Sequence, residues 1–157
     1  MNGRRPESAA ILLVEDSADD QALALRALDR LGIANEVLLA QDGAEAVAVL
    51  LRRADEGLLP PALILLDLKL PKLGGIDVLK RIRADMRTRY VPVVILTSSA
   101  EEEDIRAGYE HGANAYVRKP VKFAEFVGAV SAVGAFWLKF NQVAPVPGAV
   151  AAPGGAM

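Results

Sequence analysis

The chain has 157 residues, no cysteine, one histidine and a formal net charge of −2 at pH 7. This length is typical of one domain with a substantial core, and the composition excludes disulfides, zinc–thiolate sites, cysteine nucleophiles and sites that need two histidines. Acidic and basic residues are interleaved along the chain without a basic face, so we expect no direct nucleic-acid partner.

The first predicted unit is a strand followed by a helix. The strand is the aliphatic run 11–14, which ends in Glu15 and Asp16. Ser17 and the acidic residues after it are typical of a helix start, because a hydroxyl caps free N–H groups and carboxylates interact well with the positive end of the helix dipole. Gly32 is expected to end this helix.

The second unit is weaker, and the third contains the central strand. A strand over 35–40 precedes a helix that begins at Asp42. The run 63–66 is wholly aliphatic and is followed by Asp67. An unbroken aliphatic run between turn-forming residues indicates a parallel strand that is buried on both faces. Asp67 is therefore predicted to lie at the carboxyl end of a central strand.

The fourth and fifth units complete the pattern, with the strands 91–96 and 115–118 and the helices 99–111 and 122–140. Ser98 and Ser99, each three residues before a glutamate, fit a capping box at the start of the first of these helices. Strand and helix alternate five times. This alternation predicts an α/β fold, a doubly wound five-stranded parallel sheet that is flanked by five helices.

The two ends of the chain differ in composition from this alternating part. Residues 1–9 are predicted to be an N-terminal extension, 10–140 the folded domain, and 141–157 an uncharged, Pro/Gly/Ala-rich flexible tail. The apolar stretch 121–140 is interrupted by three charged residues, so we interpret it as a packed helix and expect no membrane partner. We expect a cytoplasmic protein.

Polar side chains follow four of the strands, and parallel strands bring these four ends to one edge of the sheet. The residues are Glu15 and Asp16, Asp67, Thr97 and Lys119. Carboxylates brought together repel one another unless a cation neutralises them, and a ligand set made only of oxygen atoms favours Mg²⁺. A lysine and a hydroxyl suit phosphate oxygens. The set predicts a site for phosphoryl transfer onto Asp67.

The chain resembles the receiver domain of two-component response regulators in four segments, namely ILLVEDSADD, LILLDLKLPKLGGIDVLKRIR, VPVVILTSSAEEED and GANAYVRKP, which occur in the family's order and spacing. The resemblance covers about residues 11–126 and implies the flavodoxin-like receiver fold. It implies that Asp67 is the phosphoacceptor, and that Glu15, Asp16, Asp67 and the backbone carbonyl of Lys69 hold Mg²⁺.

The same resemblance implies further roles. Thr97 and Lys119 are expected to hold the phosphoryl group, and Tyr116 stands where the family has a switch aromatic, whose ring turns inward as Thr97 moves toward the phosphate. The bond between Lys119 and Pro120 matches one that is usually cis in the family. Such a domain is a phosphoacceptor for a histidine kinase and not an ordinary enzyme, with Mg²⁺-dependent self-phosphorylation from small phosphodonors and autodephosphorylation.

The last helix carries a closer resemblance. It is long and ends Phe136-Trp137-Leu138, and in this it is similar to the single-domain regulators that are paired with bacterial and cyanobacterial phytochrome histidine kinases. Its apolar residues spread over more than one face, and surplus apolar surface marks an interface. We therefore expect a homodimer through the last helix and the tail.

Other functions stay open at this point. One alternative is a phosphatase of the haloacid dehalogenase type, which uses an aspartate as nucleophile. Such enzymes need a second acidic residue two positions after the nucleophile, and this chain has Lys69 at that position. A receiver that works as a phosphorylation-independent scaffold, or as a phosphate sink, would carry the same motifs as a signalling regulator. The function we favour is a regulator that signals by a phosphorylation-dependent change in protein contacts.

Overall fold

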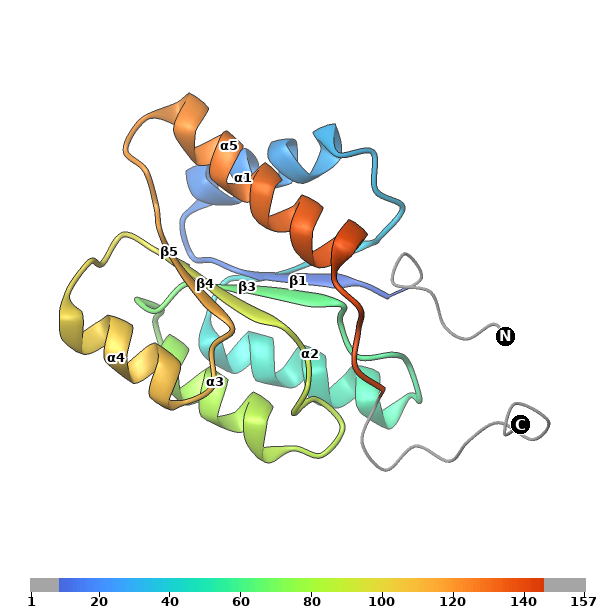
Figure 1. Cartoon of the computed structure of the whole chain (residues 1–157). Helices are drawn as coiled ribbons and strands as arrows, with labels where there is room; N and C mark the ends of the chain where they lie inside the picture. The colour runs from blue at the N-terminus through green and yellow to red at the C-terminus, as the bar shows by residue number, and fades with distance from the viewer. Residues whose placement is uncertain (1–8, 146–157) are drawn as a thin grey trace.

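The computed structural model describes residues 9–145 of the chain, and these form three layers (Figure 1). The elements in chain order are β1 (Ile11–Val14), α1 (Ala18–Arg30), β2 (Val37–Ala40), α2 (Gly43–Asp55), β3 (Leu63–Leu66), α3 (Gly75–Ala84), β4 (Val93–Thr97), α4 (Glu102–Glu110), β5 (Ala115–Arg118), α5 (Phe123–Ala135) and the π-helical segment η2 (Phe136–Phe140). The predicted fold, five parallel strands with five helices, is confirmed.

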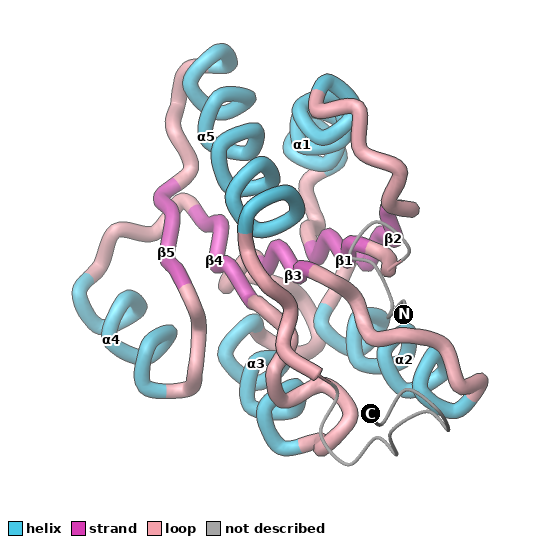
Figure 2. Tube along the Cα trace, turned by 45° about the vertical axis from the view of Figure 1, so that its right-hand side comes forward, coloured by secondary structure: helices cyan, strands magenta, loops and turns pink. Residues whose placement is uncertain are grey.

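The sheet has the strand order β2-β1-β3-β4-β5, and all four pairings are parallel. Helices α1 and α5 cover one face, and α2, α3 and α4 lie on the other (Figures 1 and 2). The order reverses between β1 and β3, because the chain first builds the sheet outward to β2 and then returns past β1. In sheets of this kind, ligands bind outside the carboxyl ends of the strands at such a reversal.

Two hydrophobic clusters hold the layers together, one on each face of the sheet. Successive side chains of a strand point to opposite faces. Ile11 and Leu13 accordingly pack with α1 and α5, whereas Leu12 and Val14 pack with α2 and α3. All residues of β1, β3 and β4 are buried, which explains why their sequences are aliphatic without alternation.

The helix caps predicted from the sequence are found at one helix start and are absent at another. Ser17 caps α1, with its hydroxyl accepting a hydrogen bond from the Asp20 N–H at 3.3 Å. The capping boxes predicted at Ser98 and Ser99 are wrong, because α4 begins only at Glu102 and its N-terminus has no side-chain cap. The Ser99 hydroxyl donates instead to the carboxylate of Asp104.

The last helix runs to Phe140 as predicted, but its final turn is π-helical. One side of it packs on α1 through Phe126, Val127, Val130 and Leu138, which belong to the core, and Gly134 lies buried beside Leu28 and Leu31 of that helix and its cap. By length and composition, 123–140 is the one described helix that could cross a membrane. Core helices satisfy the same criterion, and the packing of this helix on α1 makes it part of the hydrophobic core of the domain.

Of the predicted N-terminal extension 1–9 and tail 141–157, residues 1–8 and 146–157 lie outside the described residues. Their limits and the expected flexibility of the tail stay predictions.

Candidate functional site

Hydrogen bonds of the sheet continue past the strands and fix the backbone of three polar residues at its carboxyl edge. The Glu15 N–H donates to the carbonyl of Ala40 at 2.9 Å, and the Asp67 N–H donates to that of Val14 at 3.1 Å. The Lys119 N–H donates to the carbonyl of Thr97 at 2.7 Å. The backbone of the sheet thus brings residues far apart in sequence to one place.

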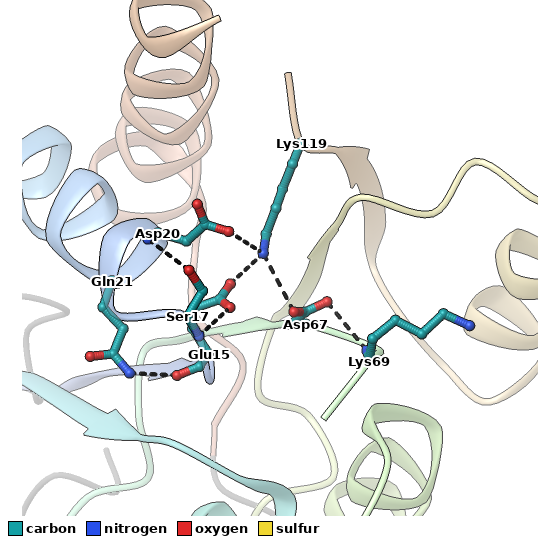
Figure 3. A network of polar contacts seen from close by, with 7 residues as sticks. All are labelled: Glu15, Ser17, Asp20, Gln21, Asp67, Lys69 and Lys119. Atoms are coloured by element: carbon teal, nitrogen blue, oxygen red, sulfur yellow. Dashed lines mark hydrogen bonds and ion pairs between the residues drawn. The ribbon is translucent and has the colours of Figure 1, made fainter. Parts of the chain in front are cut away.

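The Lys119 ammonium lies among three carboxylates (Figure 3). Its Nζ donates to Glu15 Oε1 at 2.5 Å, to Asp20 Oδ2 at 2.8 Å and to Asp67 Oδ2 at 3.4 Å. An ammonium has three N–H donors, so these contacts use all of them. Burial by itself would lower the pKa of Lys119, but the hydrogen bonds to Asp20 and Glu15 and the charge of Asp67 outweigh it and raise that pKa well above the ordinary value.

Glu15 is held on both sides of its carboxylate. One oxygen accepts from Lys119, and the other accepts from the Ser17 N–H at 3.0 Å. The Glu15 backbone carbonyl accepts from the side chain of Gln21 (Figure 3). Burial raises the pKa of Glu15, and the contacts to Lys119 and Ser17 offset this only in part. The carboxylate is therefore rigidly placed in surroundings that disfavour its charge.

Carboxylate oxygens of Glu15, Asp16 and Asp67 lie within 4.8 Å of one another. Glu15 and Asp67 are buried, whereas Asp16 is exposed. Together with Asp20, these carboxylates outnumber the single ammonium of Lys119, so the site carries surplus negative charge. Carboxylate oxygens that converge in a negatively charged site are suitable ligands for a hard divalent cation.

Lys69 contributes to the site through its backbone, and its side chain points away (Figure 3). The Lys69 N–H donates to Asp67 Oδ1 at 3.3 Å. The Lys69 ammonium pairs with Asp104 Oδ2 of α4 at 3.3 Å, and its side chain is 63% exposed. The predicted contribution of the Lys69 carbonyl to a metal stays a prediction.

Thr97 and Tyr116, the predicted switch pair, lie on the neighbouring strands β4 and β5. The Thr97 hydroxyl is fully buried and has no hydrogen-bond partner among the described residues. The Tyr116 hydroxyl donates to the backbone carbonyl of Ser99 at 2.9 Å, and its ring packs beside Gly108 of α4. Burial raises the pKa of Tyr116. Thr97 thus holds an unused donor at the sheet edge, and Tyr116 is tied to the loop that follows Thr97.

The predicted cis peptide bond between Lys119 and Pro120 is wrong, because the described residues contain no cis peptide bond. The trans form before proline is favoured by about 0.5–1 kcal/mol. The Lys119 N–H keeps its bond to Thr97 in this form, so the backbone position of Lys119 does not need the cis isomer.

Sequence reasoning missed Asp20 as part of the site. It was interpreted only as an acid at a helix start, yet it makes the second-shortest contact to Lys119. The available signal was its place in the first turn of a helix that begins at Ala18, three residues after Glu15. A carboxylate there faces the same sheet edge as the strand-end acids.

The chain matches the response regulator receiver domain family over residues 11–131. It is 38% identical to the response regulator Rcp1 of Synechocystis sp. over 130 residues, which cover 82% of this chain and 88% of Rcp1. The structure of the Mn²⁺-bound form of Rcp1 matches with a TM-score of 0.79 at 35% identity, covering 87% of this chain and 99% of that one. The phosphorylated cyanobacterial phytochrome response regulator RcpA matches with a TM-score of 0.81 at 36% identity, covering 87% and 98%.

The predicted resemblance to receiver domains, and among them to phytochrome response regulators, is confirmed by these matches. The family match spans all five strands and most of α5. The chain therefore belongs to the response regulator receiver domain family.

Proposed function

We propose that this receiver accepts a phosphoryl group on Asp67 from a histidine kinase, and that the kinase is a phytochrome-type sensor. The observation that carries the proposal is the buried Asp67 carboxylate, which contacts Lys119 on one oxygen and the Lys69 N–H on the other. The similarity to RcpA, a cyanobacterial phytochrome response regulator whose structure is of the phosphorylated form, supports both the reaction and the class of kinase.

The residues of the chain fit an in-line transfer. An ionised Asp67 oxygen attacks the phosphorus of a phosphohistidine; the oxygen–phosphorus bond forms as the nitrogen–phosphorus bond breaks, and the departing imidazole nitrogen keeps the electron pair and takes up a proton. Lys119 lies 3.4 Å from Asp67 Oδ2, so its ammonium can follow the negative charge onto a phosphoryl oxygen. The unpaired hydroxyl of Thr97 is a second donor for that group.

We propose Mg²⁺ as the metal of the site. Glu15, Asp16, Asp67 and the backbone carbonyl of Lys69 would hold it, and when bound it would neutralise charge on the phosphoryl oxygens. The converging carboxylate oxygens support this assignment, and so does the Mn²⁺-bound form of the related Rcp1. The same residues would support self-phosphorylation from small phosphodonors and autodephosphorylation.

The proposed output is a change of protein contacts in the cytoplasm, without nucleic acid or membrane. Movement of Thr97 toward a phosphoryl group would displace the loop after β4, whose Ser99 carbonyl now accepts from Tyr116. Loss of that hydrogen bond would free the Tyr116 ring to turn inward. Phosphorylation then shifts a two-state equilibrium of the β4–α4 loop and α4.

We further propose that the regulator is a homodimer through the last helix and the tail. On the last helix, the aromatic side chains of Phe123, Phe136 and Phe140 are 49%, 51% and 73% exposed, although the Phe123 ring lies beside Arg26 of α1. Exposed aromatic side chains in this number on one helix favour an interface. Sedimentation at several concentrations tests the proposal, and a concentration-independent monomer mass with and without phosphorylation would contradict it.

Intact-mass measurement after incubation with Mg²⁺ and acetyl phosphate tests the proposed reaction. We expect one added phosphoryl group on the wild-type chain and none on Asp67→Asn, with both variants folded by circular dichroism. An unmodified, folded wild-type chain would instead support the phosphorylation-independent scaffold.

A further inference from the structure

The three carboxylate partners of Lys119 differ in what else they can bind. Glu15 and Asp67 belong to the group of acids whose oxygens converge within 4.8 Å and could hold a metal, and Asp20 does not. Asp20 is therefore the one partner of Lys119 for which a metal would not compete. Its contact, at 2.8 Å, is also much shorter than that of Asp67 at 3.4 Å.

The position of the Asp20 carboxylate is set by the start of α1. Ser17 connects Glu15 to Asp20, because its N–H donates to Glu15 Oε2 at 3.0 Å and its hydroxyl accepts from the Asp20 N–H at 3.3 Å (Figure 3). A backbone fixed in this way leaves Asp20 few side-chain rotamers to search. The side chain of Asp20 is 29% exposed, whereas those of Lys119 and Glu15 are 10% and 4% exposed.

We propose that Asp20 is a positioning residue for Lys119 in the phosphoryl transfer, an inference that rests on the proposed function. Asp20 holds one N–H of the ammonium at the helix start and so keeps the other two directed at the carboxylate pocket. Without Asp20, Lys119 shares its charge between Glu15 and Asp67 alone. The ammonium of Lys119 then competes with a metal for the oxygens of these two residues, and its stronger pairing with Asp67 makes that carboxylate a weaker nucleophile.

The chain offers a matched control for this proposal in Asp19. Asp19 lies in the same first turn of α1, is exposed, and makes no ion pair with Lys119 among the described residues. Replacement of either aspartate by asparagine removes one charge from the same helix end, so both lose the same favourable interaction with the helix dipole. Only Asp20→Asn removes a charged partner of Lys119.

Two readouts test the proposal, and the first needs neither metal nor phosphodonor. In the metal-free protein, the ¹⁵N–¹H signal of the Lys119 ammonium, assigned by its loss in Lys119→Gln, should be visible because three carboxylates protect it from exchange with water. We expect Asp20→Asn to broaden this signal strongly. Asp19→Asn should leave it unchanged, and Asp20→Glu should restore it in part.

The second readout is phosphorylation by acetyl phosphate as a function of Mg²⁺ concentration. We expect Asp20→Asn to lower the rate at saturating Mg²⁺ by about tenfold, the size of effect expected for one charge-assisted hydrogen bond, and to raise the Mg²⁺ concentration needed for half the maximal rate. Asp19→Asn should stay within about twofold of the wild type.

Equal effects of the two asparagine variants, or an unchanged Lys119 signal in Asp20→Asn, would overturn the assignment. Absence of phosphorylation in the wild type would instead contradict the proposed function. The ammonium signal would still decide whether Asp20 positions Lys119.

Discussion

Replacement of Lys119 by methionine removes the ammonium from the carboxylate cluster and keeps most of the side-chain volume. Glu15, only 4% exposed, then has to stay ionised in a buried site or take up a proton. Protonation at pH 7 of a carboxyl group with an ordinary pKa of 4.5 costs about 1.4 kcal/mol per pH unit, so about 3 kcal/mol. This cost bounds the destabilisation that Glu15 can cause. Asp20 is partly exposed, and water relieves its charge.

We therefore expect Lys119→Met to lower the free energy of unfolding by about 3 kcal/mol at pH 7 and by about 1 kcal/mol at pH 5, where protonation of Glu15 is cheaper. At pH 7 the melting temperature should fall by about 10 °C. The pKa of Lys119 is raised in the folded protein, so Lys119 is protonated at both pH values, and the difference between them comes from the protonation of Glu15.

Thermal and urea unfolding of the metal-free protein, followed by circular dichroism, measures this difference. Lys122→Met is the matched control, because Lys122 is an exposed lysine of the same segment, and it should change stability by less than about 0.5 kcal/mol. Added Mg²⁺ should stabilise Lys119→Met more than the wild type, since no ammonium competes for the oxygens. A loss below about 1 kcal/mol at pH 7, or an equal loss at both pH values, would refute the reasoning.

Three further predictions concern other parts of the structure. Arg83→Met should lower the free energy of unfolding by about 2–3 kcal/mol in urea unfolding, because the guanidinium donates four hydrogen bonds that join α3 to the segments before β4 and β5. Arg81→Met, which changes an exposed residue of the same helix, should cost little. Glu15→Gln should raise the metal-free melting temperature at pH 7, where ionised Glu15 is disfavoured by burial, and should lose this advantage below the ordinary glutamate pKa; an unchanged or lower melting temperature would count against the raised pKa. Tyr116→Phe removes the hydrogen bond to Ser99 and should cost about 1 kcal/mol in the unphosphorylated protein but less after phosphorylation, a difference that hydrogen exchange at the β4–α4 loop would report.

Much of the fold could be predicted because the deciding signals are local. The strand before Asp67 is aliphatic throughout, and in the structure all its residues are buried on both faces of the sheet. The strand predicted over 115–118 is β5 to the residue. Once strands and helices alternate, the parallel order brings the strand-end residues to one edge, and this is why Glu15, Asp67 and Lys119 could be expected together.

What could not be predicted depends on contacts between distant residues. The hydroxyl of Ser99 has two possible uses, and the sequence does not show that it donates to Asp104 in place of capping α4. The partner of Asp20 is 99 residues away in the sequence, at the end of another strand. The sequence predicted a role only for the backbone carbonyl of Lys69, and it does not show that the Lys69 ammonium pairs with Asp104, 35 residues further along the chain.

The central claim is that Asp67 is the phosphoacceptor, and chemical trapping tests it most directly. Borohydride reduces an aspartyl phosphate to homoserine, so the chain would be incubated with Mg²⁺ and acetyl phosphate, reduced, digested and mapped by peptide mass. We predict homoserine at position 67 and aspartate at positions 16 and 20. Aspartate retained at position 67 in a folded, phosphorylated chain, or homoserine at another position, would contradict the account.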